Sequence, residues 1–104
     1  MPQFDVHQNA NPSSNDDIPF LLDVQSDLLD GLTTRVVIPL VRASAFGKPA
    51  RRLNPVFDVL GQPVVLSTAE LAGVHTRHLG PKVESLASER STIVAALDVL
   101  ISGI

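Results

Sequence analysis

The chain has 104 residues and a mass of 11.1 kDa, the size of one small domain with one modest core, so we treat residues 1–104 as a single domain. Eight Lys and Arg residues against 11 Asp and Glu give a formal charge of −3, which argues against a basic protein that binds nucleic acid directly. A hydrophobic content of 44% excludes disorder of the full chain, and the absence of cysteine excludes disulfides and thiolate chemistry.

Neither a membrane span nor an export signal is predicted. The most apolar stretch, Ile93–Ile101, is interrupted by Asp98 and is much shorter than the roughly 20 residues that a spanning helix needs. The first 17 residues have no basic start and no apolar run, unlike a signal peptide. We therefore expect a cytoplasmic protein.

The first half of the chain alternates between strand and turn patterns. Apolar or β-branched runs predict short strands at Phe4–His7, Phe20–Val24 and Arg35–Leu40. The polar segment 9–17 predicts an exposed loop, and the residues that follow Val24 supply turn chemistry. Because proline cannot donate to a strand ladder, Pro39 is expected at a sheet edge or at the end of its strand.

The second half predicts a hairpin followed by a helix. Val56–Leu60 and Gln62–Leu66 form the hairpin, turning at Leu60–Pro63, whereas 43–53 is ambiguous and Glu70–Val74 is either a strand or a turn. The helix pattern places Leu86, Ile93, Leu97 and Ile101 on one face, widened by Val94 and Leu100. Ser85 or Ser88 is expected to cap its start, and Gly103 to close its end in the left-handed conformation. Many strands and then one helix indicate an α+β domain.

No catalytic, metal or cofactor site is predicted. His75 and His78 form an H-x-x-H pair, but zinc needs a third ligand, so solvated polar residues are the preferred interpretation. The chain contains no G-x-S-x-G motif and no glycine-rich phosphate loop. Its arginines could serve ribonuclease chemistry, but the absence of Tyr and Trp for base stacking and the acidic charge favour ordinary surface arginines.

Two features suggest contact with a partner. Leu28 and Leu29 are adjacent within a polar turn, where they either form an exposed apolar patch or enter the core. The chain ends with Ile101, Ser102, Gly103 and Ile104, an apolar tail that is either tucked in or offered to another protein. Asp98 interrupts the apolar helix and is expected to face solvent, since a buried unpaired carboxylate is costly.

Several segments, in this order, resemble the CcdB family of bacterial toxins. The matching pieces are Gln3-Phe4 with Val6, the run Asp23-Val24-Gln25-Ser26-Asp27-Leu28-Leu29-Asp30, Arg35 with Val37-Ile38-Pro39-Leu40, Asn54-Pro55-Val56, and the final Gly103-Ile104. The resemblance covers essentially the whole chain. It implies a small SH3-like, CcdB-type antiparallel β-barrel with a second small sheet and a C-terminal α-helix.

The resemblance also implies a function. Members of the family are homodimers without catalytic activity. They bind the A subunit of DNA gyrase and trap its cleavage complex with DNA, and a CcdA antitoxin neutralises them with a disordered tail. The family's gyrase-binding surface would fall on ten residues of this chain: Gln3, Phe4, Ser26, Leu28, Leu29, Asp98, Ile101, Ser102, Gly103 and Ile104.

Two departures from the family pattern lie within that surface. Family members end in Trp-Gly-Ile, where this chain has Ser102 before Gly103 and Ile104, and Asp98 stands where the family has Asn. A Trp anchor can contribute several kcal/mol at an interface. Two alternatives therefore accompany the gyrase-poison hypothesis: a CcdB-fold binding protein that is inactive on gyrase, and an RNA-cleaving toxin on the related fold.

Overall fold

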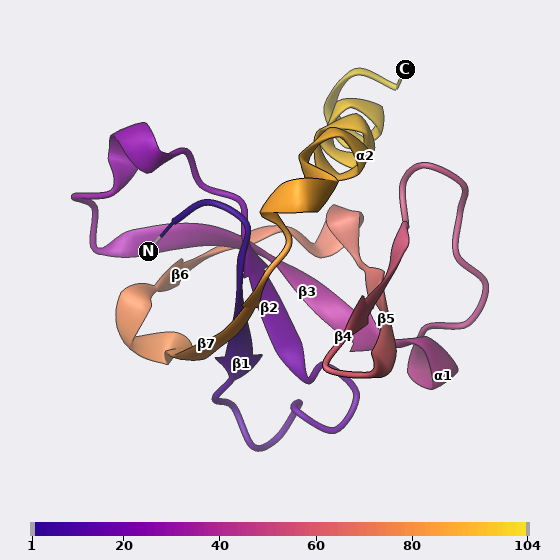
Figure 1. The fold of residues 1–104 in the computed structure, drawn as a ribbon, viewed down its shortest axis with the longest axis horizontal. Coiled ribbons are helices and arrows are strands. Elements are labelled where there is room, and N and C mark those ends of the chain that lie inside the picture. The colour runs from indigo at the N-terminus through magenta and orange to yellow at the C-terminus, as the bar shows by residue number, and fades with distance from the viewer. Residues whose placement is uncertain (1, 104) are drawn as a thin grey trace.

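A computed structural model describes residues 2–103 (Figure 1). Its strands are β1 (Asp5–Asn9), β2 (Phe20–Asp23), β3 (Thr34–Arg42), β4 (Val56–Val59), β5 (Gln62–Leu66), β6 (Ala72–His75) and β7 (Leu79–Ser85). Its α-helices are α1 (Ala43–Phe46) and α2 (Arg90–Ser102). Single 3-10 turns occupy η1 (Asp27–Leu29), η2 (Thr68–Glu70), η3 (Thr76–His78) and η4 (Ala87–Glu89). No helix in this part of the chain is long and apolar enough to cross a bilayer.

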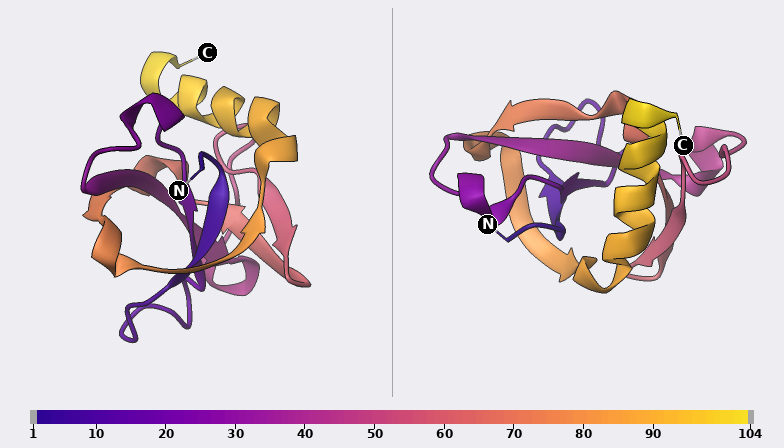
Figure 2. Two further views of the ribbon diagram at one scale, coloured as in Figure 1. Left: turned by 60° about the vertical axis from the view of Figure 1, so that its left-hand side comes forward. Right: turned by 90° about the horizontal axis from the view of Figure 1, so that it is seen from above.

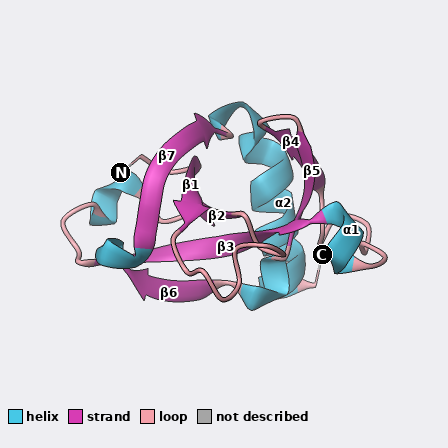
Figure 3. Ribbon diagram, turned by 90° about the horizontal axis from the view of Figure 1, so that it is seen from below, coloured by secondary structure: helices cyan, strands magenta, loops and turns pink. Residues whose placement is uncertain are grey.

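The strands form one curled antiparallel sheet in the order β4-β5-β3-β2-β1-β7. The long strand β3 binds two partners on the same side, β6 along Thr34–Val37 and β5 along Leu40–Arg42 (Figure 3). The α+β class is confirmed, but the architecture is a curled half-barrel rather than the expected barrel with a second sheet. The small sheet is instead a branch of the main one, because β3 is long enough to pair with both β5 and β6.

Pro39 lies inside the central strand β3, so the expectation of an edge or strand end is wrong. It pairs with Leu21 of β2 on one side. On the other side it falls between the segments that bind β5 and β6, and its carbonyl accepts from the Ser67 N–H at 3.0 Å. A residue's N and C=O point to the same side of an extended strand, so the missing donor of proline faces this gap, where it disrupts no ladder.

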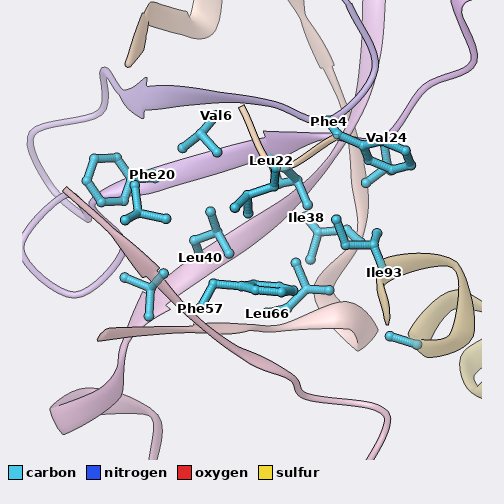
Figure 4. Close-up of a cluster of buried hydrophobic side chains, with 14 residues drawn as sticks. Phe4, Val6, Phe20, Leu22, Val24, Ile38, Leu40, Phe57, Leu66 and Ile93 are labelled. Atoms are coloured by element: carbon cyan, nitrogen blue, oxygen red, sulfur yellow. The ribbon is translucent and has the colours of Figure 1, made fainter. Parts of the chain in front are cut away.

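The core lies between one face of the sheet, the β4–β5 hairpin and α2 (Figure 4). Alternation places Leu22, Ile38 and Leu40 on that face, in contact with side chains from the hairpin such as Phe57 and Leu66. The hairpin turns at Leu60 and Gly61, both with positive φ, as its sequence predicts. The two ambiguous segments resolve as the short helix α1 with a loop, and as η2 followed by β6.

Helix α2 packs only its first half onto the core. Ile93 is fully buried, whereas Ile101 on the same predicted face is 79% exposed, because the helix extends beyond the strands (Figures 1 and 2). Gly103 closes the helix at φ 72° and donates to the Val99 carbonyl, which confirms its predicted role. At the other end, the residue that caps α2 is Glu89 and no side chain bonds to the free N–H groups there, so the expected serine cap is wrong. The Ser85 Oγ accepts from the Ala87 N–H instead, ahead of η4.

Candidate functional site: an exposed leucine turn and a projecting helix end

The turn that carries Leu28 and Leu29 presents both side chains to solvent. Leu28 is 94% exposed and Leu29 is 50% exposed. The Ser26 Oγ accepts from the Leu28 N–H at 3.2 Å and begins η1, and the Asp30 N–H closes the turn on the Asp27 carbonyl. The alternative of an exposed apolar patch is therefore confirmed over burial in the core. We call residues 26–30 the leucine turn.

A buried polar network holds the leucine turn against the sheet. The Arg35 guanidinium binds both carboxylate oxygens of Asp23 at 2.7 and 3.1 Å, and both side chains are buried. The same guanidinium reaches the Asp30 carboxylate at 3.2 Å, at the end of the turn. The Gln25 amide donates to the Leu29 carbonyl, and its oxygen accepts from the Val36 N–H. These contacts fix the turn at several points, so the leucines are presented on a rigid support.

The arginine of this network stays charged at any working pH. The hydrogen bond to Asp23 raises the pKa of Arg35 above its already high ordinary value, against the lowering effect of burial. The stabilisation from a raised pKa is complete at pH values below the ordinary pKa and is lost only when pH rises through the shifted one. The arginine side of the pair is therefore insensitive to pH near neutrality.

The N-terminal segment links the leucine turn to the start of α2. The Gln3 N–H donates to the Asp27 carboxylate at 2.8 Å, and its side chain accepts from Arg90 at 3.1 Å. Phe4 is only 3% exposed, beneath the Arg90 guanidinium at 5.6 Å. The surface placement expected for Phe4 is therefore wrong. Its backbone takes a positive φ of 70° between bonds to the Asp23 carbonyl and the Leu86 N–H, and its ring enters the core.

The C-terminal end of α2 is the second exposed region, which we call the helix end. Ile101, Ser102 and Gly103 are all exposed, and Asp98 faces solvent as expected. Asp98 also lines a shallow hollow along the outer face of the helix with Val94 and Ala95. Ile104 lies outside the described residues.

The predicted binding surface is thus divided between two places on one chain. Arg90, which donates to the Gln3 side chain, is roughly 16 Å along the helix axis from Ile101, at 1.5 Å per residue. In Figure 1 and in the right view of Figure 2, the leucine turn and the helix end lie apart. A partner that touches both regions must be large, as a protein is.

His75 and His78 have a structural arrangement. The His75 Nδ1 accepts from the Arg77 N–H at 3.1 Å and caps η3, while the two rings meet edge to face at 6.4 Å. Among residues 2–103, no three His, Asp or Glu side chains gather as a metal site would require. Arg77 and His78 line a groove opposite Asn9 and Asn11.

Sequence reasoning missed the residues that support the leucine turn. Asp23, Gln25 and Arg35 are buried polar side chains, and the structure gives each of them hydrogen-bond partners. The available signal was an arginine inside an apolar strand pattern, at Arg35. A buried guanidinium requires a buried carboxylate, and Asp23, at the end of the preceding strand, was a candidate.

The chain is thus a curled half-barrel with one long terminal helix and with exposed apolar side chains at the leucine turn and the helix end. The Mycobacterium tuberculosis toxin MazF-mt6 has a similar fold, with a TM-score of 0.72 and 19% sequence identity over 92% of this chain and 94% of that chain. The family model described as CcdB protein matches residues 3–103. The chain belongs to the CcdB family of toxins and has a MazF-like fold.

Proposed function

We propose that this protein is the toxin of a type II toxin–antitoxin module, which binds the A subunit of DNA gyrase and traps the gyrase–DNA cleavage complex. The observation that carries the proposal is the rigid presentation of Leu28, at 94% exposure, beside Gln3 and Ser26. Apolar anchors fixed before binding lose little conformational entropy, which is the property of an interface hot spot. The protein acts by docking and carries out no chemistry of its own.

Replacing Leu28 with Asp is expected to weaken binding to the gyrase A subunit about 30-fold or more, which corresponds to roughly 2 kcal/mol for a hot-spot side chain. The side chain is fully in solvent, so the free energy of unfolding should change by less than about 0.5 kcal/mol. Titration of labelled toxin with purified gyrase A subunit, followed by anisotropy, measures the effect. Leu60→Asp is the matched control, because Leu60 is 57% exposed in the β4–β5 turn. Equal affinities of the two variants would refute the site.

The helix end supports a proposal of homodimerisation. Ile101 is 79% exposed and Leu100 is beside it on a helix that extends beyond its own core. A second copy related by a two-fold axis would cover the same side chains on both protomers. A CcdA-like antitoxin would then bind the dimer.

We expect Ile101→Asp to convert the dimer into a folded monomer and Leu28→Asp to leave the dimer intact. Sedimentation velocity over a range of concentrations distinguishes the two states. Circular dichroism serves as the control for folding, since Ile101 makes little contact with the core. A wild-type protein that sediments as a monomer at high micromolar concentration would rule out the dimer.

An RNA-cleaving toxin is the second candidate, and the groove at η3 favours it. Arg77 and His78 offer a cation and an imidazole there, in a groove that Asn9 and Asn11 also line. Incubation of the purified protein with total RNA, followed by mapping of new 5′ ends, tests this function. Defined ends that disappear in a His78→Ala variant would establish it in place of gyrase binding.

A further inference from the structure

The charges of this acidic protein are strongly segregated along the chain. Residues 31–57 contain five of the eight Lys and Arg residues and no Asp or Glu. Three of these cations, Lys48, Arg51 and Arg52, lie within five residues in the loop between α1 and β4. We call residues 48–52 the basic loop.

The basic loop is exposed and its cations are uncompensated. Lys48, Arg51 and Arg52 are exposed, and in the described part of the chain their side chains make no ion pair or hydrogen bond. By contrast, Arg35 and Lys82 are in ion pairs, and Arg42 donates hydrogen bonds to Asp16 and Gln62. Three adjacent unpaired cations repel one another, which is unfavourable for the free protein unless an anion binds.

The loop also has a defined shape. The Asn54 side chain accepts from the Ala50 N–H and donates to the Leu66 carbonyl, both at 3.0 Å, which ties the loop to β5. The Thr68 hydroxyl donates to the Leu53 carbonyl at the same place. Arg52 adopts a positive φ of 67°, a conformation that Asn or Gly adopts more easily than Arg. These bonds tie the backbone of the loop, from which the three cationic side chains extend, to the β5 end of the sheet.

We propose that the basic loop is a docking surface for an acidic peptide segment of a partner protein. Val56, four residues beyond the basic loop at the start of β4, is 52% exposed, so this part of the chain offers an apolar side chain as well as three positive charges. A peptide with carboxylates and small apolar side chains matches both features. A nucleic-acid duplex matches less well, because its long charged backbone would also meet the rest of the surface, which is acidic. Outside the basic loop the chain has five Lys and Arg residues against 11 Asp and Glu. This inference does not depend on gyrase binding.

The test uses the full chain and a short fluorescent peptide in which Glu alternates with Ala and Val. We expect binding at low ionic strength that weakens with added salt, and no binding of the same peptide with Lys in place of Glu. Arg51→Gln should weaken binding about twofold to fivefold, the usual effect of one exposed ion pair. Arg77→Gln is the matched control, since it removes the same charge from an exposed arginine in η3 and should leave binding unchanged.

A second variant separates binding from folding. Arg52→Asn suits the positive φ, so the melting temperature should stay the same or rise while peptide affinity falls about twofold to fivefold. Equal losses in Arg51→Gln and Arg77→Gln would show that only net charge matters and would overturn the proposal. Tighter binding of a duplex DNA oligonucleotide than of the peptide, lost in Arg51→Gln, would assign the loop to nucleic acid instead.

Discussion

Arg35→Ala is expected to lower the free energy of unfolding by about 3–5 kcal/mol, a large part of the stability of a domain of this size. The substitution leaves the Asp23 carboxylate buried without its cation and removes the ion pair with Asp30 at the end of the leucine turn. Urea denaturation followed by circular dichroism measures the loss. Because the turn loses its support, binding through Leu28 should weaken as well, although Arg35 itself is buried.

Two controls show whether the buried pair is responsible. Arg77→Ala removes an exposed arginine that makes no ion pair in the described structure, and should change the unfolding free energy by less than about 0.5 kcal/mol. The double variant Asp23→Leu with Arg35→Met removes both charges and should recover part of the loss, since no charge is then left buried alone. A loss in Arg35→Ala no larger than that in Arg77→Ala would mean that water or another cation reaches Asp23.

The fold could be predicted as far as local pattern determines it. The strand and helix periods place β1 to β5 and α2 correctly, because each of these segments alternates or repeats on its own. The prediction for Pro39 is wrong because a proline is tolerated inside β3 only where neither β5 nor β6 pairs with it. That gap is a property of the tertiary pairing, which the local pattern does not show. Ile101 continues the apolar period of α2 but is exposed, since a helical period does not reveal where the underlying sheet ends.

The candidate site was predictable in part for a similar reason. Two leucines in a polar turn are equally compatible with exposure and with burial. The hydrogen bonds that fix the turn decide between these two placements. Those bonds join residues far apart in sequence, such as Gln3 with Asp27 and Arg90. Phe4 was expected on the surface because the resemblance gives only its place in the sequence. It does not reveal the positive φ of Phe4, which directs the ring into the core.

Ser102→Trp is expected to strengthen binding to the gyrase A subunit about 30-fold or more, by restoring the aromatic residue of the family tail. Ser102 is the exposed last residue of α2, so a Trp side chain there points away from the core of its own chain and causes no clash with it. A Trp buries roughly 150–250 Å² at an interface, which accounts for an effect of about 2 kcal/mol. Calorimetric titration of both proteins with the gyrase A subunit measures the change.

The matched control is Ser91→Trp, an exposed serine near the other end of the same helix. It adds the same apolar area without placing it in the tail, so any gain from general stickiness would appear in both variants. A gain confined to Ser102→Trp means that the helix end contacts gyrase and that the natural serine keeps this affinity low. Equal affinities of wild type and Ser102→Trp would mean that this chain does not bind gyrase through its tail as the family does. The leucine turn would then be the only proposed gyrase contact left to test.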